Sequence, residues 1–256
     1  MIDLKRRYKL IIGFIITGII LISIFLITKD KKIYYLSLGD SLSVGQTPYN
    51  TIGKIYGDYV SDYLKDREKL EFYTKDFSKS GYRSIDILND LNSNKQIKVN
   101  NKKITIKNAL IKADLVTLSI GANDLFYKLN IGTEFDLNDS DDLYIYVDQC
   151  VLDIDKLLFE LRKACKEQIM VFGFYNPFTN FSSNLANTVE PIIKYANIRM
   201  KKIVEKYDMT FIDIHNMFLA NDDYLPSFFE IHPTKKGYKA MGDKVISLID
   251  KKILAK

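Results

Sequence analysis

The chain has 256 residues, of which 47% are hydrophobic and 27% are charged, and its net charge at pH 7 is +5. Residues 1–32 hold seven Lys or Arg and two Asp, so they carry the whole +5, and residues 33–256 are neutral. A neutral body lacks the excess of cations that neutralises phosphates, which argues against a nucleic-acid partner. Residues 33–256 are long enough to bury one hydrophobic core and are expected to form one domain.

An uninterrupted apolar segment lies near the N-terminus. Residues 10–28 contain no charge, and a helix of that length covers roughly 28 Å, close to the hydrocarbon thickness of a membrane. We expect residues 1–9 to be a cytoplasmic basic tail, 10–28 a single transmembrane anchor and 29–32 a linker. The stronger cluster of positive charge precedes the segment, which predicts that residues 33–256 lie outside the cell membrane. Secretion after cleavage of a signal peptide is the alternative, although no small-residue cleavage site is found.

Short β-rich runs alternate with longer amphipathic runs after the linker. Strands are expected at residues 33–39, 70–77, 114–121, 169–175 and 209–214. Helices are expected at residues 52–66, 83–91, 143–166, 185–206 and 234–254. This alternation predicts an α/β fold, with a parallel sheet between two layers of helices as a three-layer α/β/α sandwich. The run 98–106 predicts a small hairpin turning at Asn100-Asn101, and the acidic stretch 133–142 predicts a surface loop.

The two cysteines, Cys150 and Cys165, both fall within the predicted helix 143–166. Fifteen residues of helix separate them by about 22 Å, which is too far for a disulfide. The chain has only two histidines to add to them, so the ligands for a zinc site are also too few. We therefore expect a domain that needs neither a disulfide nor a metal.

Polar residues follow three of the β-rich runs. The first run ends in the string GDS, which finishes at Ser41. Gly81 follows the second run, and the string GAND, which contains Asn123, follows the third. Ligands of open α/β sheets bind beyond the carboxyl ends of the strands. Each residue has a plainer reading as a helix cap or a turn glycine. Together they supply a hydroxyl, a backbone N–H and a side-chain amide, the parts of an oxyanion hole around a nucleophilic serine.

A serine hydroxyl is a weak nucleophile that needs an adjacent base. His232 lies in the loop PSFFEIHP just before the last predicted helix, where catalytic groups commonly gather. His215 follows a predicted strand among apolar residues and is expected to be a packing residue. The sequence therefore favours His232 as the base for Ser41.

The order of the strings GDS, Gly81, GAND and His232-Pro233 resembles the SGNH, or GDSL, family of lipases and acylhydrolases over about residues 33–254. The resemblance implies a flavodoxin-like fold in which Ser41 attacks an ester carbonyl. It also implies an oxyanion hole made of the Ser41 and Gly81 backbone N–H groups and the Asn123 side chain. A serine esterase of this kind needs no cofactor, and its substrate would be a small-molecule, lipid or O-acyl glycan ester.

One position departs from the family pattern. The family usually has an aspartate three residues before the histidine, where it orients the imidazole, and here that residue is Phe229. Glu230 is one substitute, Asp222 or Asp223 of the preceding loop is another, and a backbone carbonyl in a Ser-His dyad is a third. The departure also keeps an alternative function open, namely a catalytically weak or inactive membrane-tethered binding module that retains the fold.

Four aromatic residues lie in the loops near the predicted base. Tyr224, Phe228, Phe229 and Phe178 are candidates to wall an apolar acyl pocket. Ordinary packing beneath a loop is an equally good interpretation of all four. The sequence does not choose between a lipid ester and an acylated glycan.

Overall fold

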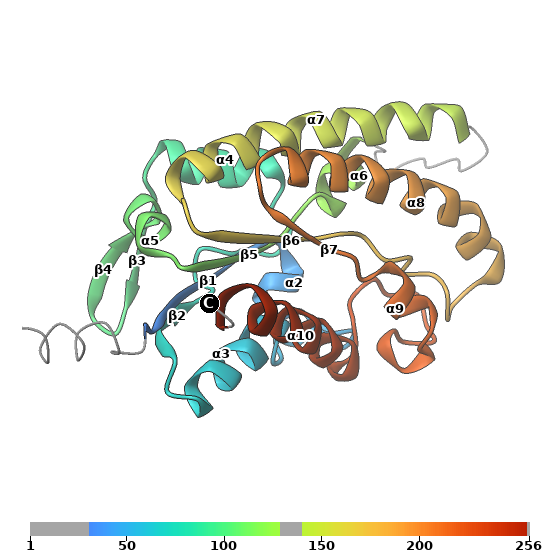
Figure 1. Cartoon of the computed structure of the whole chain (residues 1–256). Helices are drawn as coiled ribbons and strands as arrows, with labels where there is room; N and C mark the ends of the chain where they lie inside the picture. Colours follow the sequence, from blue (N-terminus) through green and yellow to red (C-terminus); the bar gives the residue numbers. More distant parts are fainter. Residues whose placement is uncertain (1–30, 129–139, 255–256) are drawn as a thin grey trace, which may run out of the picture. The chain divides into compact units, whose positions relative to one another are not determined.

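The computed structural model describes residues 31–128 and 140–254, with a five-stranded sheet at the centre (Figure 1). Its strands are β1 (Ile33–Gly39), β2 (Leu70–Thr74), β5 (Leu115–Ser119), β6 (Gln168–Phe172) and β7 (Thr210–Ile212). The strands lie in the order β2-β1-β5-β6-β7, and all four pairings are parallel. Counted within this sheet alone the order is 2-1-3-4-5, that of flavodoxin-like sheets. The expected α/β class with a parallel sheet is confirmed.

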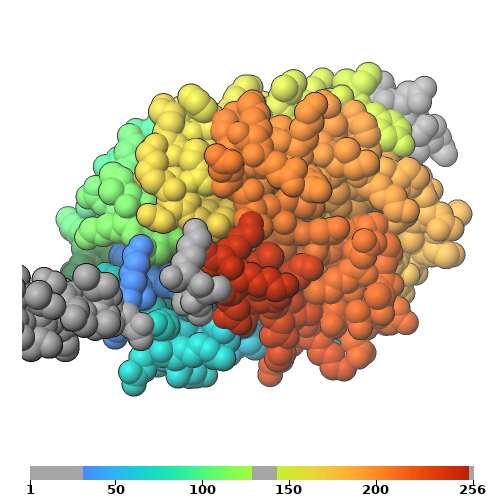
Figure 2. Space-filling view, in the orientation of Figure 1, coloured from blue at the N-terminus to red at the C-terminus, as the bar shows by residue number. Residues whose placement is uncertain are grey.

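Helices cover both faces of the sheet (Figure 1). One face is covered by α3 (Tyr56–Asp66) and α10 (Lys235–Ile249), whose side chains meet on the surface shown in Figure 2. The other is covered by α4 (Ser84–Asn92), α5 (Ile106–Lys112), α7 (Ser140–Ala164) and α8 (Ser183–Lys206). The shorter elements are α2 (Ser41–Val44), α6 (Ala122–Lys128), α9 (His215–Leu219), a 3₁₀ turn (Asp222–Tyr224) and a final π-helical turn (Asp250–Leu254).

Strand β1 is buried along its whole length. Successive side chains of a strand point to opposite faces. Tyr34, Leu36 and Leu38 accordingly join the core beneath α4, α7 and α8, whereas Tyr35 joins the core beneath α3 and α10. Burial on both faces explains why this strand is an almost continuous apolar run. It also holds the carboxyl end of β1, where Ser41 follows, in a fixed position.

The structure departs from the expected boundaries in several places. Helix α3 begins at Tyr56 rather than at residue 52, because the preceding residues form a turn in which the Gly53 N–H donates to the Gly45 carbonyl at 2.8 Å. Strand β2 ends at Thr74, whose hydroxyl accepts a hydrogen bond from the Asp76 N–H and turns the chain. The short helices α5, α6 and α9 were not expected, since none is long enough to show a helical period.

The expected hairpin is present as β3 (Gln96–Val99) and β4 (Lys102–Thr105). Asn100 and Asn101 have φ values of 48° and 62°, as a type I′ hairpin turn requires. Cys150 and Cys165 are both free and buried, in agreement with the sequence. Cys150 lies within α7, and Cys165 follows its last residue.

The proposed anchor, residues 10–28, lies outside the described residues, as do residues 1–9 and 129–139. Residues 140–142, which close the expected acidic loop 133–142, instead begin helix α7. Among the helices that the structure does describe, none combines the length and the apolar character needed to cross a membrane.

Candidate active site

Ser41 lies at the carboxyl end of β1, where the chain turns into α2. The preceding Gly39 has a φ of +138°, and a Cβ there would lie 2.0 Å from the Ser119 carbonyl oxygen of β5, so no side chain fits. The Asp40 carboxylate caps α2 by accepting from the Leu42 N–H at 3.1 Å, and it also accepts from the Ser119 hydroxyl at 3.1 Å. The turn is thus tied to two strands at the point where the strand order reverses, which is where sheets of this kind bind ligands.

The Oγ atom of Ser41 lies 2.9 Å from Nε2 of His232, which is 191 residues further along the chain. On the other side of the ring, Nδ1 lies 2.6 Å from Oε1 of Glu230. Because a carboxylate only accepts hydrogen bonds, Nδ1 carries the proton and donates a hydrogen bond to Glu230. The lone pair of Nε2 is then free to accept the Ser41 hydroxyl. The imidazole is buried, with 6% of His232 exposed.

The Glu230 carboxylate is itself held in place. Its Oε1 also accepts from the backbone N–H groups of Ile231, at 2.7 Å, and His232, at 3.2 Å. The Ile231 carbonyl accepts a hydrogen bond from the hydroxyl of Tyr175, which follows strand β6. The short spacing of Glu230 and His232 is therefore fixed by a local turn that the body of the domain supports.

The other candidates for orienting the imidazole lie elsewhere. Asp223 forms an exposed ion pair with Lys236, with 2.6 Å between Oδ2 and Nζ. Asp222 is exposed within the 3₁₀ turn. Phe229 is 64% exposed, and its ring stacks on that of Phe178 with 5.9 Å between centroids. Of the residues considered from the sequence, only Glu230 meets the ring in the part of the chain that the structure describes.

Asn123, in the first turn of α6, lines the same cavity as Ser41 and His232. Its Nδ2 donates one hydrogen bond to the Tyr82 carbonyl at 3.0 Å, which leaves the second N–H of the amide for a ligand. Gly81 lies one residue before Tyr82 in an exposed loop, with a φ of +81° that favours glycine. Gly81 is not among the residues that line the cavity.

The loop that carries Gly81 is tied down at both ends. On one side the Lys79 N–H donates to the Gly39 carbonyl at 3.1 Å, next to the serine. On the other side the buried Asp124 carboxylate accepts from both the backbone N–H and the hydroxyl of Ser84. These bonds place Gly81 between the end of β1 and the start of α6.

Burial raises the pKa of Asp40 to about 7, although its hydrogen bonds from Leu42 and Ser119 act in the opposite direction. Burial likewise raises the pKa of Asp124. Around neutral pH the Asp40 side chain therefore adds only part of a negative charge beside the serine. A weaker negative charge there is compatible with an anion forming nearby.

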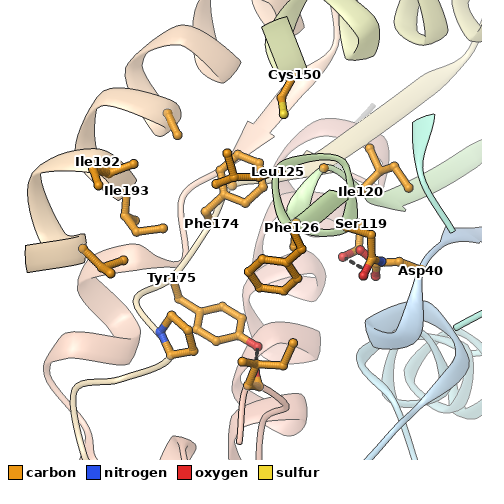
Figure 3. Close-up of a pocket in the computed structure, with 18 of the residues that line it drawn as sticks. Asp40, Ser119, Ile120, Leu125, Phe126, Cys150, Phe174, Tyr175, Ile192 and Ile193 are labelled. Atoms are coloured by element: carbon orange, nitrogen blue, oxygen red, sulfur yellow. Dashed lines mark hydrogen bonds between the residues drawn. The ribbon is translucent and has the colours of Figure 1, made fainter. Parts of the chain in front are cut away.

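A cavity of about 250 Å³ opens from Ser41 and His232 into the layer formed by α6, α7 and α8. Figure 3 shows Asp40 and Ser119 on one side of it and Ile192 and Ile193 on the other, with Phe126 between them. The cavity is lined mainly by hydrocarbon. Its polar groups are concentrated near the serine and the histidine.

The aromatic residues suggested by the sequence divide into two pairs. Phe178 and Phe229 line the cavity. The other two contact neighbouring rings instead: Tyr224 packs on Phe218 at 5.7 Å between centroids, and Phe228 contacts Tyr49 at 6.0 Å. Ordinary loop packing is the correct interpretation of Tyr224 and Phe228.

His215 is buried, 5% exposed, and lies away from the lining of the cavity. Its Nε2 is 3.0 Å from Oε1 of Glu190, off the line of a good hydrogen bond. Glu190 also accepts from the Asn176 amide at 3.1 Å. The histidine is buried at the start of α9 and faces α8, in agreement with the packing role expected from the sequence.

Sequence reasoning missed Tyr175 and part of the role of Asp40. The GDS string indicates a helix cap at Asp40, which the structure shows, but it does not indicate the hydrogen bond from Ser119. The predicted strand 169–175 includes Tyr175, whereas the residue lies beyond β6 and fixes the loop of the histidine. A polar aromatic residue at the carboxyl end of the predicted strand was the available signal for Tyr175.

Comparison with known proteins identifies the family. Residues 37–240 match the model of the GDSL-like lipase/acylhydrolase family. The spore germination lipase LipC of Bacillus licheniformis is 24% identical, over 82% of this chain and 93% of that protein.

Solved structures share the fold. The lipase Lip_vut3 from a goat rumen metagenome superposes with a TM-score of 0.65 at 23% identity, over 83% of this chain and 95% of that one. The acetylxylan esterase Axe2 of Geobacillus stearothermophilus gives 0.58 at 18% identity, over 87% and 96%. Because the family model spans most of the sequence, the chain belongs to the GDSL-like lipase/acylhydrolase family and is a hydrolase that acts on ester bonds.

Proposed function

We propose that the protein is a serine esterase in which Ser41 is the nucleophile, His232 the general base and Glu230 the residue that orients the base. The observation that carries the proposal is the unbroken path from the Ser41 Oγ through the imidazole to the Glu230 carboxylate, with distances of 2.9 and 2.6 Å. A nucleophile, a base and an orienting group within hydrogen-bond reach are the signature of covalent acyl transfer.

The reaction proceeds in two steps. His232 takes the hydroxyl proton as the Ser41 Oγ bonds to the ester carbonyl carbon, and the carbonyl oxygen becomes an oxyanion. The bond to the alcohol oxygen then breaks, and the alcohol leaves with the proton from His232. Water, deprotonated by the same imidazole, attacks the acyl-serine and releases the carboxylic acid. No metal or organic cofactor takes part.

The oxyanion is held by the Ser41 and Gly81 backbone N–H groups and by the Asn123 side chain. Ser41 is the first residue of α2, so its N–H has no acceptor within that helix. The second amide hydrogen of Asn123 is available beside the cavity. Gly81 is the least constrained of the three, since only the attachment of its loop supports this role.

The substrate is a carboxylic ester of a lipid or an O-acylated glycan, met at the outer surface of the cell membrane. The uncharged segment 10–28, with its basic N-terminal flank, supports a single-pass anchor and an extracytoplasmic catalytic domain. The two relatives support the two ester classes equally. The sequence relative is named a spore germination lipase, which supports a lipid ester, and the structural relative is named an acetylxylan esterase, which supports an O-acylated glycan.

Hydrolysis of p-nitrophenyl butyrate by the full chain tests the proposal. Ser41→Ala should lower kcat by at least about 10³, because removing the nucleophile leaves only binding and oxyanion stabilisation. The matched control is Ser227→Ala, an exposed serine five residues before the base, which should keep the wild-type rate. Equal rates for Ser41→Ala and the wild-type chain would refute the assignment.

A further inference from the structure

The cavity beside the serine extends well beyond what ester cleavage needs. A water molecule takes up about 30 Å³ in the liquid, so 250 Å³ has room for on the order of eight. Protein interiors are close-packed, and voids larger than a water are few. An acetyl group on Ser41 would leave most of this space unfilled. The size of the cavity therefore needs an explanation beyond the serine itself.

Among the residues that the structure describes, the far part of the cavity is lined by apolar side chains of α7 and α8. Val147, Cys150 and Val151 contribute from α7, and Ile192, Ile193 and Ala196 contribute from α8. Cys150 adds no charge, because burial raises the pKa of its thiol to about 12. Such a surface offers a sugar hydroxyl or a charged headgroup no hydrogen-bond partner, and desolvating them there would be unfavourable.

The mouth of the cavity has the same character. Phe229, which occupies the position where the family usually has its aspartate, lines the cavity together with Phe178. The Phe229 ring also contacts that of Phe181 edge-on, with 5.4 Å between centroids. Glu230 has the contact to the imidazole, so position 229 is free to extend the apolar wall toward the solvent.

We propose that this cavity holds the linear acyl chain of the substrate, which makes the protein an esterase for medium-chain or longer fatty acyl esters. The proposal rests on the assignment of Ser41 as nucleophile. The acyl group stays bonded to Ser41 through both steps, whereas the alcohol must leave before water attacks. A deep apolar cavity suits the group that stays, because an alcohol chain within it would have to withdraw in every turnover.

The first test is the chain-length dependence of the full chain on p-nitrophenyl acetate, butyrate, octanoate and laurate. Each fully buried methylene should raise kcat/KM by about fourfold. With partial burial we expect a rise of at least about 30-fold from acetate to octanoate. Octanoate no better than acetate would overturn the inference, while hydrolysis of both would leave the proposed function intact.

The second test separates an acyl chain from an alcohol chain. Ethyl octanoate and octyl acetate are isomers with the same apolar content, and they differ only in the side of the ester that carries the chain. The inference predicts a kcat/KM at least tenfold higher for ethyl octanoate. A preference for octyl acetate would place the chain on the alcohol side and contradict the acyl assignment.

The third test fills the cavity. Ala196→Phe on α8 and Val151→Phe on α7 should each lower the octanoate-to-acetate ratio at least tenfold. The matched control is Ile198→Phe, on the same helix as Ala196 but 68% exposed, which should keep the wild-type ratio. Labelling by a fluorophosphonate reports whether each variant retains its reactive serine. Labelled variants with an unchanged octanoate-to-acetate ratio would contradict the inference. If neither variant folds, the chain-length series of the wild-type chain decides whether the inference holds.

Discussion

The Glu230 carboxylate lies 2.6 Å from Nδ1 of His232, two residues away in the same loop. The longer side chain of glutamate and a turn closed by bonds from the Ile231 and His232 N–H groups allow this approach. The position three residues before the histidine is thereby released, and Phe229 there lines the apolar cavity. One local arrangement thus brings a carboxylate to the imidazole and an aromatic ring to the cavity.

Replacing Glu230 by glutamine should lower kcat by about 10²–10⁴, because an amide no longer fixes the tautomer or supports the imidazolium. KM should change little, since the residue does not contact substrate. The matched control is Asp223→Asn, an acidic residue of the same loop that pairs with Lys236 at the surface. Its rate should stay within twofold of wild type. Steady-state kinetics on a butyrate ester measures kcat for both variants. A larger loss of kcat for Asp223→Asn than for Glu230→Gln would show that Glu230 is not the carboxylate that orients the imidazole.

Asn123→Ala should lower kcat by about 10²–10³ through the loss of one oxyanion donor. It also removes the bond to the Tyr82 carbonyl, which should lower the free energy of unfolding by about 1 kcal/mol. Asn184→Ala, at an exposed position of α8, is the control for both quantities. A loss of stability without a loss of kcat would assign Asn123 a structural role only.

The pKa of Asp40, raised by burial to about 7, predicts a pH dependence of stability. Between its ordinary pKa of 3.8 and about 7, the folded chain binds more protons at this residue than the unfolded chain does. The contribution of Asp40 to the free energy of unfolding therefore falls as pH rises through that window, by up to about 1.4 kcal/mol per pH unit.

The side chain of the Asp40→Asn variant cannot titrate, so this variant should lose the contribution of Asp40 to the fall of the free energy of unfolding with pH. Chemical unfolding followed by circular dichroism at pH 4.5 and 7.5 is the suitable measurement, since the chain has no tryptophan. The stability of the variant relative to wild type should rise between the two pH values. Parallel profiles would show that the carboxylate does not titrate differently in the folded state.

Asp124→Ala should lower the free energy of unfolding by about 1–3 kcal/mol, because it leaves the buried N–H and hydroxyl of Ser84 without their acceptor. Asp243→Ala breaks only an exposed ion pair with Lys239 and should change the free energy of unfolding by less than about 1 kcal/mol. Equal effects in the same unfolding assay would mean that water satisfies Ser84 in the variant.

The parallel sheet was predictable because its central strands are buried on both faces. The run 33–39 matches β1 at both ends, and Asn100-Asn101 marked the hairpin turn. The helices α5 and α6 were missed because seven residues make two turns at most, too few for a period to show. The predicted start of helix α3, residue 52, is four residues too early. The turn before the helix depends on the hydrogen bond from Gly53 to Gly45, which apolar spacing does not indicate.

The site was predictable as far as it depends on strand ends. Parallel strands bring their carboxyl ends to one edge, which places Ser41 and Asn123 together. The choice between Glu230 and a Ser-His dyad could not be made, because the loop has no periodic pattern and a distant residue, Tyr175, fixes it. The cavity between α7 and α8 was also beyond prediction, since it depends on how two helices pack rather than on either sequence alone.

The identity of the nucleophile can be measured directly. The folded full chain is treated with a fluorophosphonate, digested and mapped by mass spectrometry. We predict a single adduct on Ser41, absent in Ser41→Ala and formed much more slowly in His232→Ala. An adduct on a different serine, or none on a chain that hydrolyses esters, would contradict the role of Ser41.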